Sequence, residues 1–193
     1  MKRSLRGVAG AVDLWALSSK NILVQLARAR YSFAARFVAG DVADIGCGFG
    51  YGASILLQSA AVRSLVCVDI DKRALWRAHE MVADPRARFE LVDVENQRLP
   101  HADWYVLCEV LEHLHRPADV VERVQRRARA GVVISVPLGQ TTNPYHRHVM
   151  SADRVEDAFA QPSHGCWRML ESQRLHETEH TEYGLWAWER VTT

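Results

Sequence analysis

The sequence predicts an α/β fold, in which a mostly parallel sheet carries helices on both of its faces. Short apolar runs alternate with helical stretches between residues 41 and 137. Successive strand–helix units of this kind build parallel sheets with right-handed crossovers. The last two strand-like runs, residues 165–174 and 185–191, have no long helix between them. We therefore expect them to form a terminal antiparallel hairpin.

The first part of the chain is expected to be helical. From residue 12 to residue 38, apolar side chains recur mostly at helical spacing, and Ser18 and Ser19 divide the segment. An apolar run over residues 41–45 then ends in alternating glycines, which predicts a strand and a tight turn. A helix over residues 53–59 follows that turn.

The middle of the chain continues the same alternation. The second strand is expected over residues 64–69. Asp71 is expected to cap a helix over residues 72–82, because its short carboxylate can accept a free N–H of the first helical turn. Two more apolar runs predict strands over residues 88–93 and 104–108.

The second half adds a helix and a fifth strand before the hairpin. The helix is expected over residues 118–128, with a basic face in solvent, and the strand over residues 131–137. Residues 138–162 are the least regular segment. Within them, Ser151 is expected to cap a helix that runs through residue 159.

Composition limits the class of protein. The chain has 193 residues and a formal net charge of +1, which fits one domain and gives no electrostatic argument for nucleic acid. Its four cysteines form neither a disulfide framework nor a zinc pattern, so a reduced, cytoplasmic protein is expected. The basic start resembles a signal peptide, but Asp13 interrupts its apolar run. No stretch is long and apolar enough to span a membrane.

The glycine turn after the first strand is the main functional signal. Gly46, Gly48 and Gly50 alternate between an apolar run and a helix, an arrangement that cradles nucleotides at the carboxyl end of a strand. The dinucleotide fingerprint differs, because Tyr51 occupies its third glycine position. Asp44 would repel a pyrophosphate and suit a cation instead. These features argue against a nicotinamide oxidoreductase.

The residues around this turn resemble those of a known family. Asp44-Ile45-Gly46-Cys47-Gly48 resembles the first motif of class I S-adenosylmethionine-dependent methyltransferases, and Val68-Asp69-Ile70-Asp71 resembles the second. The resemblance implies a Rossmann-like seven-stranded sheet whose last strand inserts antiparallel. It also implies S-adenosyl-L-methionine as cofactor. The residues that would hold it are Arg30, Tyr31, Asp44, Gly46, Gly48, Tyr51, Asp69, Ile70, Asp93, Val94 and Glu109.

Individual roles follow from the same resemblance. Asp69 would bind the ribose hydroxyls, at the spacing from the turn that also suits this contact on physical grounds. Asp93 and the backbone N–H of Val94 would contact the adenine. The whole chain would be one domain in four parts: a helical segment (1–40), a cofactor-binding core (41–137), a substrate-side segment (138–165) and a terminal hairpin (166–193).

A second group of polar residues follows the fourth strand. Glu109, Glu112 and His113 have the i, i+3, i+4 spacing that places side chains on one helical face. Two carboxylates and an imidazole at one place call for a counter-charge, which a divalent cation would supply. His146 or His148, which follow the fifth strand, would complete the set.

This group resembles two kinds of methyltransferase. Ubiquinone-pathway O-methyltransferases carry Glu-x-x-Glu-His here, and so do small-RNA 3′-terminal 2′-O-methyltransferases, which add a later histidine. The implied metal ligands are Glu109, Glu112, His113 and His148, with Mg²⁺, Mn²⁺, Fe²⁺ or Zn²⁺ as the ion. In many relatives the motif holds no known metal. In that case His113, His146 or His148 would act as general base.

The acceptor is expected to be a hydroxyl group. Residues 143–148 resemble an Asn-Pro-Tyr-His-x-His stretch associated with small, glycan or specialised metabolites. The sequence therefore predicts O-methylation of a small-molecule or glycan hydroxyl, in a pocket that a second subunit could complete. The alternatives are an RNA 2′-O-methyltransferase, which the near-neutral charge disfavours, and a non-catalytic binding module. The intact Asp44, Asp69 and Asp93 argue against the module.

Overall fold

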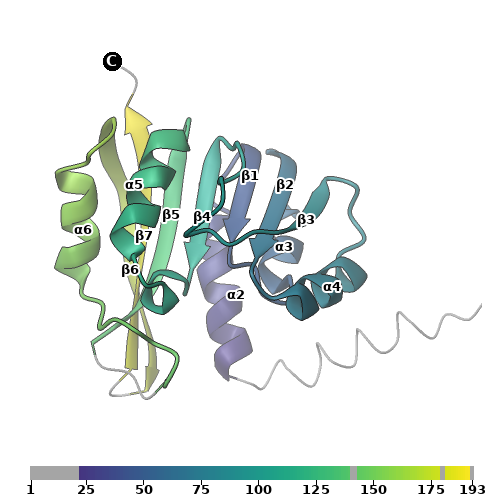
Figure 1. The fold of residues 1–193 in the computed structure, drawn as a ribbon, viewed down its shortest axis with the longest axis horizontal. Helices are drawn as coiled ribbons and strands as arrows, with labels where there is room; N and C mark the ends of the chain where they lie inside the picture. The colour runs from purple at the N-terminus through teal and green to yellow at the C-terminus, as the bar shows by residue number, and fades with distance from the viewer. Residues whose placement is uncertain (1–21, 140–142, 179–180, 192–193) are drawn as a thin grey trace, which may run out of the picture.

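The computed structural model describes residues 22–139, 143–178 and 181–191, and these form one layered α/β unit (Figure 1). Its seven strands make a single sheet in the order β3-β2-β1-β4-β5-β7-β6. The strands are β1 Gly40–Ile45, β2 Val62–Asp69, β3 Ala87–Leu91, β4 Trp104–Cys108, β5 Gly131–Leu138, β6 Cys166–Thr178 and β7 Thr181–Val191.

The pairing of the strands confirms the expected topology. Strands β1 to β5 pair in parallel, whereas β7 runs antiparallel to both β5 and β6. The helices are α2 Ile22–Ala34, α3 Tyr51–Leu56, α4 Lys72–Met81, α5 Pro117–Arg127 and α6 Ala152–Ala160, with a short 3₁₀ turn, η1, at Leu111–His113. The predicted residues 12–21 of the leading helix lie outside the described residues.

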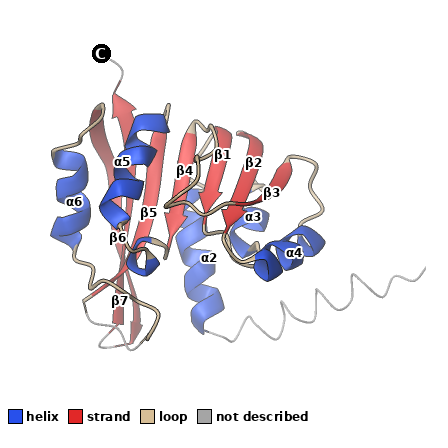
Figure 2. Cartoon of the chain, in the orientation of Figure 1, coloured by secondary structure: helices blue, strands red, loops and turns tan. Residues whose placement is uncertain are grey.

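The helices cover the two faces of the sheet separately. Helices α5 and α6 pack on one face with Ala43 and Ile45 of β1, and α2, α3 and α4 pack on the other with Val42 (Figure 2). The alternation along β1 is the two-residue period of a strand that is buried on both sides. Because five strands are parallel, their carboxyl ends share one edge, and the loops with the candidate residues gather there.

The local end signals explain most element boundaries. Asp71 accepts a hydrogen bond from the N–H of Arg73, and Ser151 accepts one from the N–H of Arg154. Both residues are therefore the N-caps that the sequence predicts. Helix α3 begins at Tyr51, two residues earlier than expected, because Gly50 in the left-handed region turns the chain directly into the helix. The hairpin strands are longer than predicted because paired polar residues extend them.

Helix α2 and the turn that follows it contact the hairpin that lies far along the chain. A nitrogen of the Arg36 guanidinium lies 2.6 Å from a carboxylate oxygen of Glu171 on β6. The guanidinium carbon of Arg30 lies 5.1 Å from the centre of the Tyr183 ring on β7, within the range of a cation–π contact. The leading helix therefore joins the first and last parts of the sheet.

Candidate active site

The glycine turn leaves β1 through three residues with positive φ. Gly46 and Gly48 have φ of 70° and 53°, values that side-chain-bearing residues rarely adopt. A Cβ at Gly46 would also lie 2.6 Å from Cγ2 of Val110, whereas nothing lies within 4 Å of a Cβ at Gly48. Gly46 is therefore fixed by packing, and Gly48 leaves open space beside the backbone.

Asp69 holds this turn from the end of β2. One carboxylate oxygen accepts a hydrogen bond from the N–H of Gly48 at 2.8 Å, and the other accepts one from the N–H of Asp71 at 2.9 Å. The same carboxylate therefore orients the glycine turn and the start of α4. Its predicted contact with ribose hydroxyls stays a prediction.

Asp44 is buried below the turn and meets the leading helix. It is fully buried, and its Oδ1 accepts a hydrogen bond from the Tyr31 hydroxyl at 3.0 Å. Burial raises the pKa of Asp44 to about 7, although the Tyr31 hydrogen bond opposes that shift. The Tyr31 ring lies over Gly52, where a Cβ would come within 2.0 Å of it. The lack of a side chain at residue 52 thus allows α2 to approach the turn.

A cavity of about 380 Å³ opens at the carboxyl edge beside the turn. Seven of the residues singled out from the sequence line it: Gly46, Asp69, Ile70, Asp93, Val94, Glu109 and His113. Its size is within the range of small-molecule sites. Arg30, Tyr31, Asp44, Gly48 and Tyr51 are not among its lining residues.

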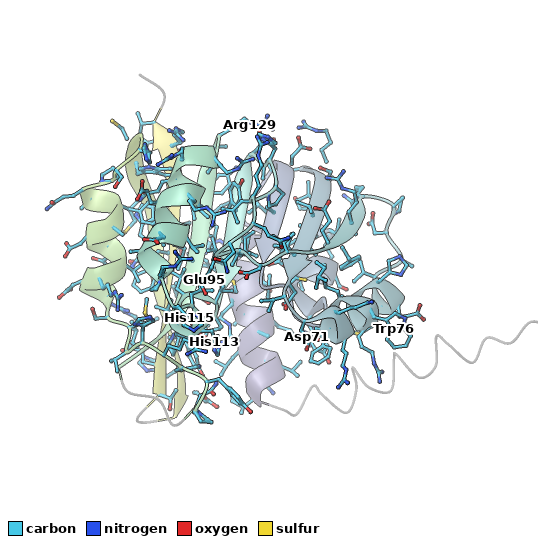
Figure 3. The ribbon with its side chains drawn as sticks, in the orientation of Figure 1. Asp71, Trp76, Glu95, His113, His115 and Arg129 are labelled. Atoms are coloured by element: carbon cyan, nitrogen blue, oxygen red, sulfur yellow. The ribbon has the colours of Figure 1, made fainter. Side chains whose placement is uncertain are left out.

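Three polar lining residues are not among the predicted site residues: Glu95, His115 and Arg147. Figure 3 shows Glu95, His115 and His113 close together below the carboxyl ends of the central strands. Glu95 accepts a hydrogen bond from the N–H of Arg116 at 2.8 Å, and its other oxygen lies 3.1 Å from Nδ1 of His115. These residues come from three different loops, after β3, before α5 and after β5, and only the folded chain brings them to one cavity.

Asp93 forms the turn that leaves the third strand. Its carboxylate accepts hydrogen bonds from the side-chain amide of Asn96 at 2.7 Å and from the N–H of Glu95 at 3.0 Å. These bonds, the Asn96 bond first, lower the pKa of Asp93. Strand β3 ends at Leu91, two residues before the predicted end, because Asp93 already belongs to this turn.

Glu109 occupies a strained position directly after β4. Its φ is 57°, the only positive value at a non-glycine residue in the described ranges. Its carboxylate accepts a hydrogen bond from the Ser135 hydroxyl at 2.8 Å. Burial raises the pKa of Glu109, and the charge of Arg30 opposes that shift.

The prediction that Glu109, Glu112 and His113 share one helical face is therefore wrong. The left-handed conformation of Glu109 separates it from the 3₁₀ turn, which begins at Leu111 and contains only Glu112 and His113 of the three.

Glu112 is fully buried, and neither of its carboxylate oxygens has a hydrogen-bond partner among the described residues. Burial first, and the charge of Glu109 second, raise its pKa to about 8. Its Oε1 lies 3.8 Å from Nε2 of His113. Nδ1 of His113 lies 3.2 Å from the carbonyl oxygen of Tyr145, which can only accept. The Nε2 lone pair of a neutral His113 therefore faces Glu112.

The structure gathers Glu112, His113 and His146, with one donor atom of each within 4.8 Å of the others. The two imidazole rings lie 4.7 Å apart and nearly perpendicular. This set differs from the predicted metal ligands, because Glu109 and His148 are not part of it. Ser135 holds the carboxylate of Glu109, and the backbone of His148 is bonded to the carbonyl oxygen of Glu112. Nε2 of His148 is buried without a described partner.

The donor set of this cluster fits a divalent cation. A buried carboxylate without partners needs a positive charge beside it. Asn143 Nδ2 lies 2.9 Å from Nε2 of His146 and donates to its lone pair, so a metal ion bound at this nitrogen would displace the amide. Burial and the neighbouring His113 lower the pKa of His146, which keeps its imidazole neutral.

Comparison with known proteins identifies the family. Residues 43–134 match the methyltransferase domain family. A probable S-adenosylmethionine-dependent methyltransferase from Mycobacterium tuberculosis is 32% identical over 134 residues, covering 63% of this chain and 47% of that protein. These matches support a class I S-adenosylmethionine-dependent methyltransferase. The names of its relatives support S-adenosylmethionine as the cofactor.

Other relatives of this methyltransferase chain carry more specific names. A malonyl-[acyl-carrier protein] O-methyltransferase from Neorickettsia risticii is 26% identical over 138 residues, covering 66% of this chain and 55% of that protein. The chain thus spans about half the length of the curated relatives it matches. Among the described helices, none has the length and apolar character needed to cross a membrane.

Solved structures share the methyltransferase fold at low identity. The small RNA methyltransferase HEN1 superposes with a TM-score of 0.71 at 16% identity, over 86% of this chain and 25% of that one. The [4+2]-cyclase SpnF also gives a TM-score of 0.71, at 12% identity, over 88% of this chain and 83% of that one. A fold shared with a cyclase does not by itself name the reaction.

Proposed function

We propose that the chain transfers a methyl group from S-adenosylmethionine to the hydroxyl oxygen of a small-molecule or glycan acceptor, assisted by a divalent metal ion. One observation carries this proposal: His113 lines the 380 Å³ cavity and also belongs to the cluster with Glu112 and His146. The cofactor side and the candidate metal side therefore meet at one residue.

The cofactor would occupy the cavity along the carboxyl edge. Asp69 would bind the ribose hydroxyls, and Ile70 and Val94 would offer apolar contacts to the adenine beside Asp93, since all four residues line the cavity. The reacting end would then face Glu109 and His113. Alignment of the acceptor oxygen with the methyl group supplies much of the rate in such reactions.

Glu112, His113 and His146 would hold the metal ion. When bound, the ion lowers the pKa of a coordinated hydroxyl and so favours its attack near neutral pH. The residues themselves provide one carboxylate oxygen and two imidazole nitrogens, a set that suits Mn²⁺, Fe²⁺ or Zn²⁺. Without a metal, His113 would be the general base in preference to His146 or His148, because of these three histidines only His113 lines the cavity.

Transfer to oxygen has support among the relatives, since one of them is named an O-methyltransferase. The RNA 2′-O-methyltransferase alternative is supported by a fold likeness to HEN1 and is disfavoured by the formal net charge of +1. The non-catalytic module is disfavoured because the glycine turn and Asp69 remain joined by a hydrogen bond.

The test measures transfer from S-adenosylmethionine to a panel of catechol, sugar and alcohol acceptors, with metal content determined by mass spectrometry. We expect chelation to abolish transfer while leaving S-adenosylhomocysteine binding unchanged, and re-addition of one ion to restore it. Glu112→Gln should lose both metal and transfer. Glu80→Gln, which changes an exposed carboxylate on α4, is the matched control. Full activity of a metal-free preparation would remove the metal from the proposal.

A further inference from the structure

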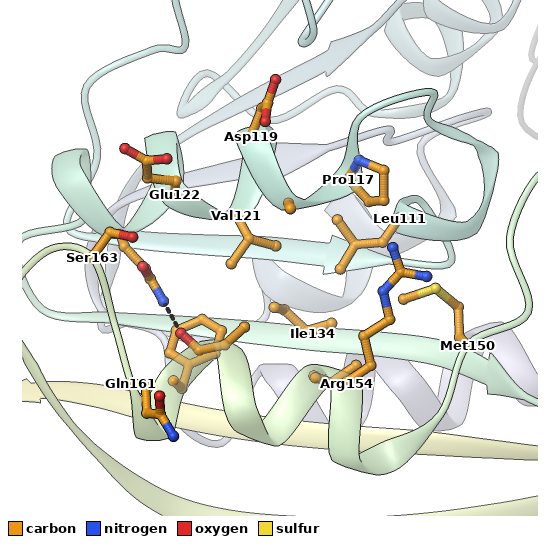
Figure 4. Close-up of a pocket in the computed structure, with 15 residues that line it drawn as sticks. Leu111, Pro117, Asp119, Val121, Glu122, Ile134, Met150, Arg154, Gln161 and Ser163 are labelled. Carbon is orange, nitrogen blue, oxygen red and sulfur yellow. Dashed lines mark hydrogen bonds between the residues drawn. The ribbon is translucent and has the colours of Figure 1, made fainter.

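A second cavity, of about 260 Å³, lies on the face of the sheet that α5 and α6 cover. Figure 4 shows it between the two helices, with Ile134 of β5 at its base. Its floor is buried and apolar and includes Leu111, Val121 and Phe159. It shares no lining residue with the cavity at the carboxyl edge, so it is a separate groove.

The acidic side chains on its rim have arginine partners, whereas one basic side chain has no described partner. Glu122 pairs with Arg126 at 2.9 Å, and Asp119 lies 3.8 Å from Arg116. Arg154 on α6 also lines the groove, but no hydrogen bond or ion pair of its guanidinium occurs within the described ranges. Figure 4 shows this guanidinium reaching across the groove toward Leu111. The rim therefore presents one uncompensated cation above an apolar floor.

We propose that this groove binds a small apolar monocarboxylate, with its chain on the buried floor and its carboxylate on Arg154. The planar guanidinium matches a carboxylate with two parallel hydrogen bonds. The nearby carboxylates of Asp119 and Glu122 disfavour a ligand of higher negative charge, such as a phosphate. The volume is below the usual range of about 300–1,000 Å³ for ligand pockets, which limits the ligand to a short or medium chain.

The groove also touches both segments that carry the candidate metal cluster. Leu111 belongs to the same 3₁₀ turn as Glu112 and His113. Met150 follows the segment with His146 and is held by a hydrogen bond from the N–H of Gly139 to its carbonyl oxygen. An occupant would therefore contact the back of the active-site turn without entering the cofactor cavity.

The test uses octanoate as the probe. Phe159 lines the groove and stacks on Trp188 with ring centres 4.1 Å apart, so tryptophan fluorescence should report occupancy. We expect saturable octanoate binding by fluorescence and calorimetry, weakened at least tenfold by Arg154→Gln. Ala158→Phe, which fills the groove from α6, should abolish it. Arg73→Gln, which changes an exposed arginine on α4, should bind like the wild type.

Two comparisons make the test decisive. Circular dichroism establishes that each variant is folded, and 1-octanol replaces octanoate to separate the charge from the apolar chain. Octanol should bind to the wild type at least tenfold more weakly than octanoate does. The Arg154→Gln variant should bind octanol and octanoate with equal affinity. Absence of octanoate binding to the wild type, or equal binding of both probes, would overturn the proposal.

Discussion

The hydroxyl of Tyr31 lies 3.0 Å from Oδ1 of the fully buried Asp44. This bond joins the leading helix to the strand that carries the glycine turn. Among the described residues, Tyr31 is the only hydrogen-bond donor to the Asp44 side chain. We therefore expect the position of helix α2 and the conformation of the glycine turn to stabilise one another through this bond.

Tyr31→Phe should destabilise the protein by about 1–3 kcal/mol, because a buried carboxyl group would lose its hydrogen-bond donor. Urea unfolding followed by circular dichroism measures the change. Tyr145→Phe is the matched control, since that side chain is 77% exposed. Equal stabilities of the two variants would contradict the structural role of the bond.

Stability of the cofactor-free protein should fall as the pH rises from about 4 to about 7. The folded pKa of Asp44 is raised from 3.8 to about 7, so the folded state holds a proton that the unfolded chain has released. This contribution is fully present below the unfolded pKa and is lost as the pH rises through the folded pKa. Asp44→Asn should remove a pH-dependent change in the free energy of unfolding on the order of 2–4 kcal/mol over this range. Glu80→Gln should leave the pH profile as it is in the wild type.

Gly48→Ala should retain the fold and lose cofactor binding. The added Cβ meets nothing within 4 Å, so the cost to folding is the strain of φ 53°, about 1–2 kcal/mol. Gly139→Ala is a close control, because that glycine has φ 75° and equal space but lies outside the glycine turn. Calorimetry with S-adenosylhomocysteine should separate the two, and normal binding by Gly48→Ala would show that the turn does not cradle the ligand.

Asp69→Ala should weaken S-adenosylmethionine binding by about 1.5–3 kcal/mol, through loss of a charge-assisted contact and of the bond that holds Gly48. Asp71→Ala removes the cap of α4 and should cost about 1 kcal/mol of stability while sparing affinity. Calorimetry and thermal unfolding of both variants check this contrast. Similar affinity losses in both would indicate that helix α4, and not the Asp69 carboxylate, controls binding.

Much of the fold and half of the site follow from local sequence signals. Parallel strands buried on both faces appear as apolar runs, and caps such as Asp71 and Ser151 identify themselves by residue type. The left-handed conformation of Glu109 has no such signal, because most residues with a positive φ are glycines and the sequence has a glutamate here. The spacing after β4 therefore suggested a helical face that the backbone does not form.

Local sequence signals also could not indicate which of His146 and His148 lies beside Glu112 and His113. It depends on the N–H groups of Arg147 and His148, which both bond to the carbonyl oxygen of Glu112 across more than thirty residues of sequence. The groove at Arg154 was missed for a similar reason, since it lies between two amphipathic helices, α5 and α6, that pack on the same face of the sheet. Such features follow from tertiary packing and not from the pattern of any one segment.

The contacts of α2 with the hairpin bear on how the chain is made in the cell. Arg30 on α2 contacts Tyr183, and Arg36, in the turn after α2, pairs with Glu171. These contacts can form only after the ribosome has added more than 130 further residues. At about 5–20 residues per second, that interval lasts roughly 7–30 s. During it, the apolar face of α2 has only the early strands to cover it. Nascent chains stalled before β6 should therefore be more susceptible to proteolysis in α2 than released protein.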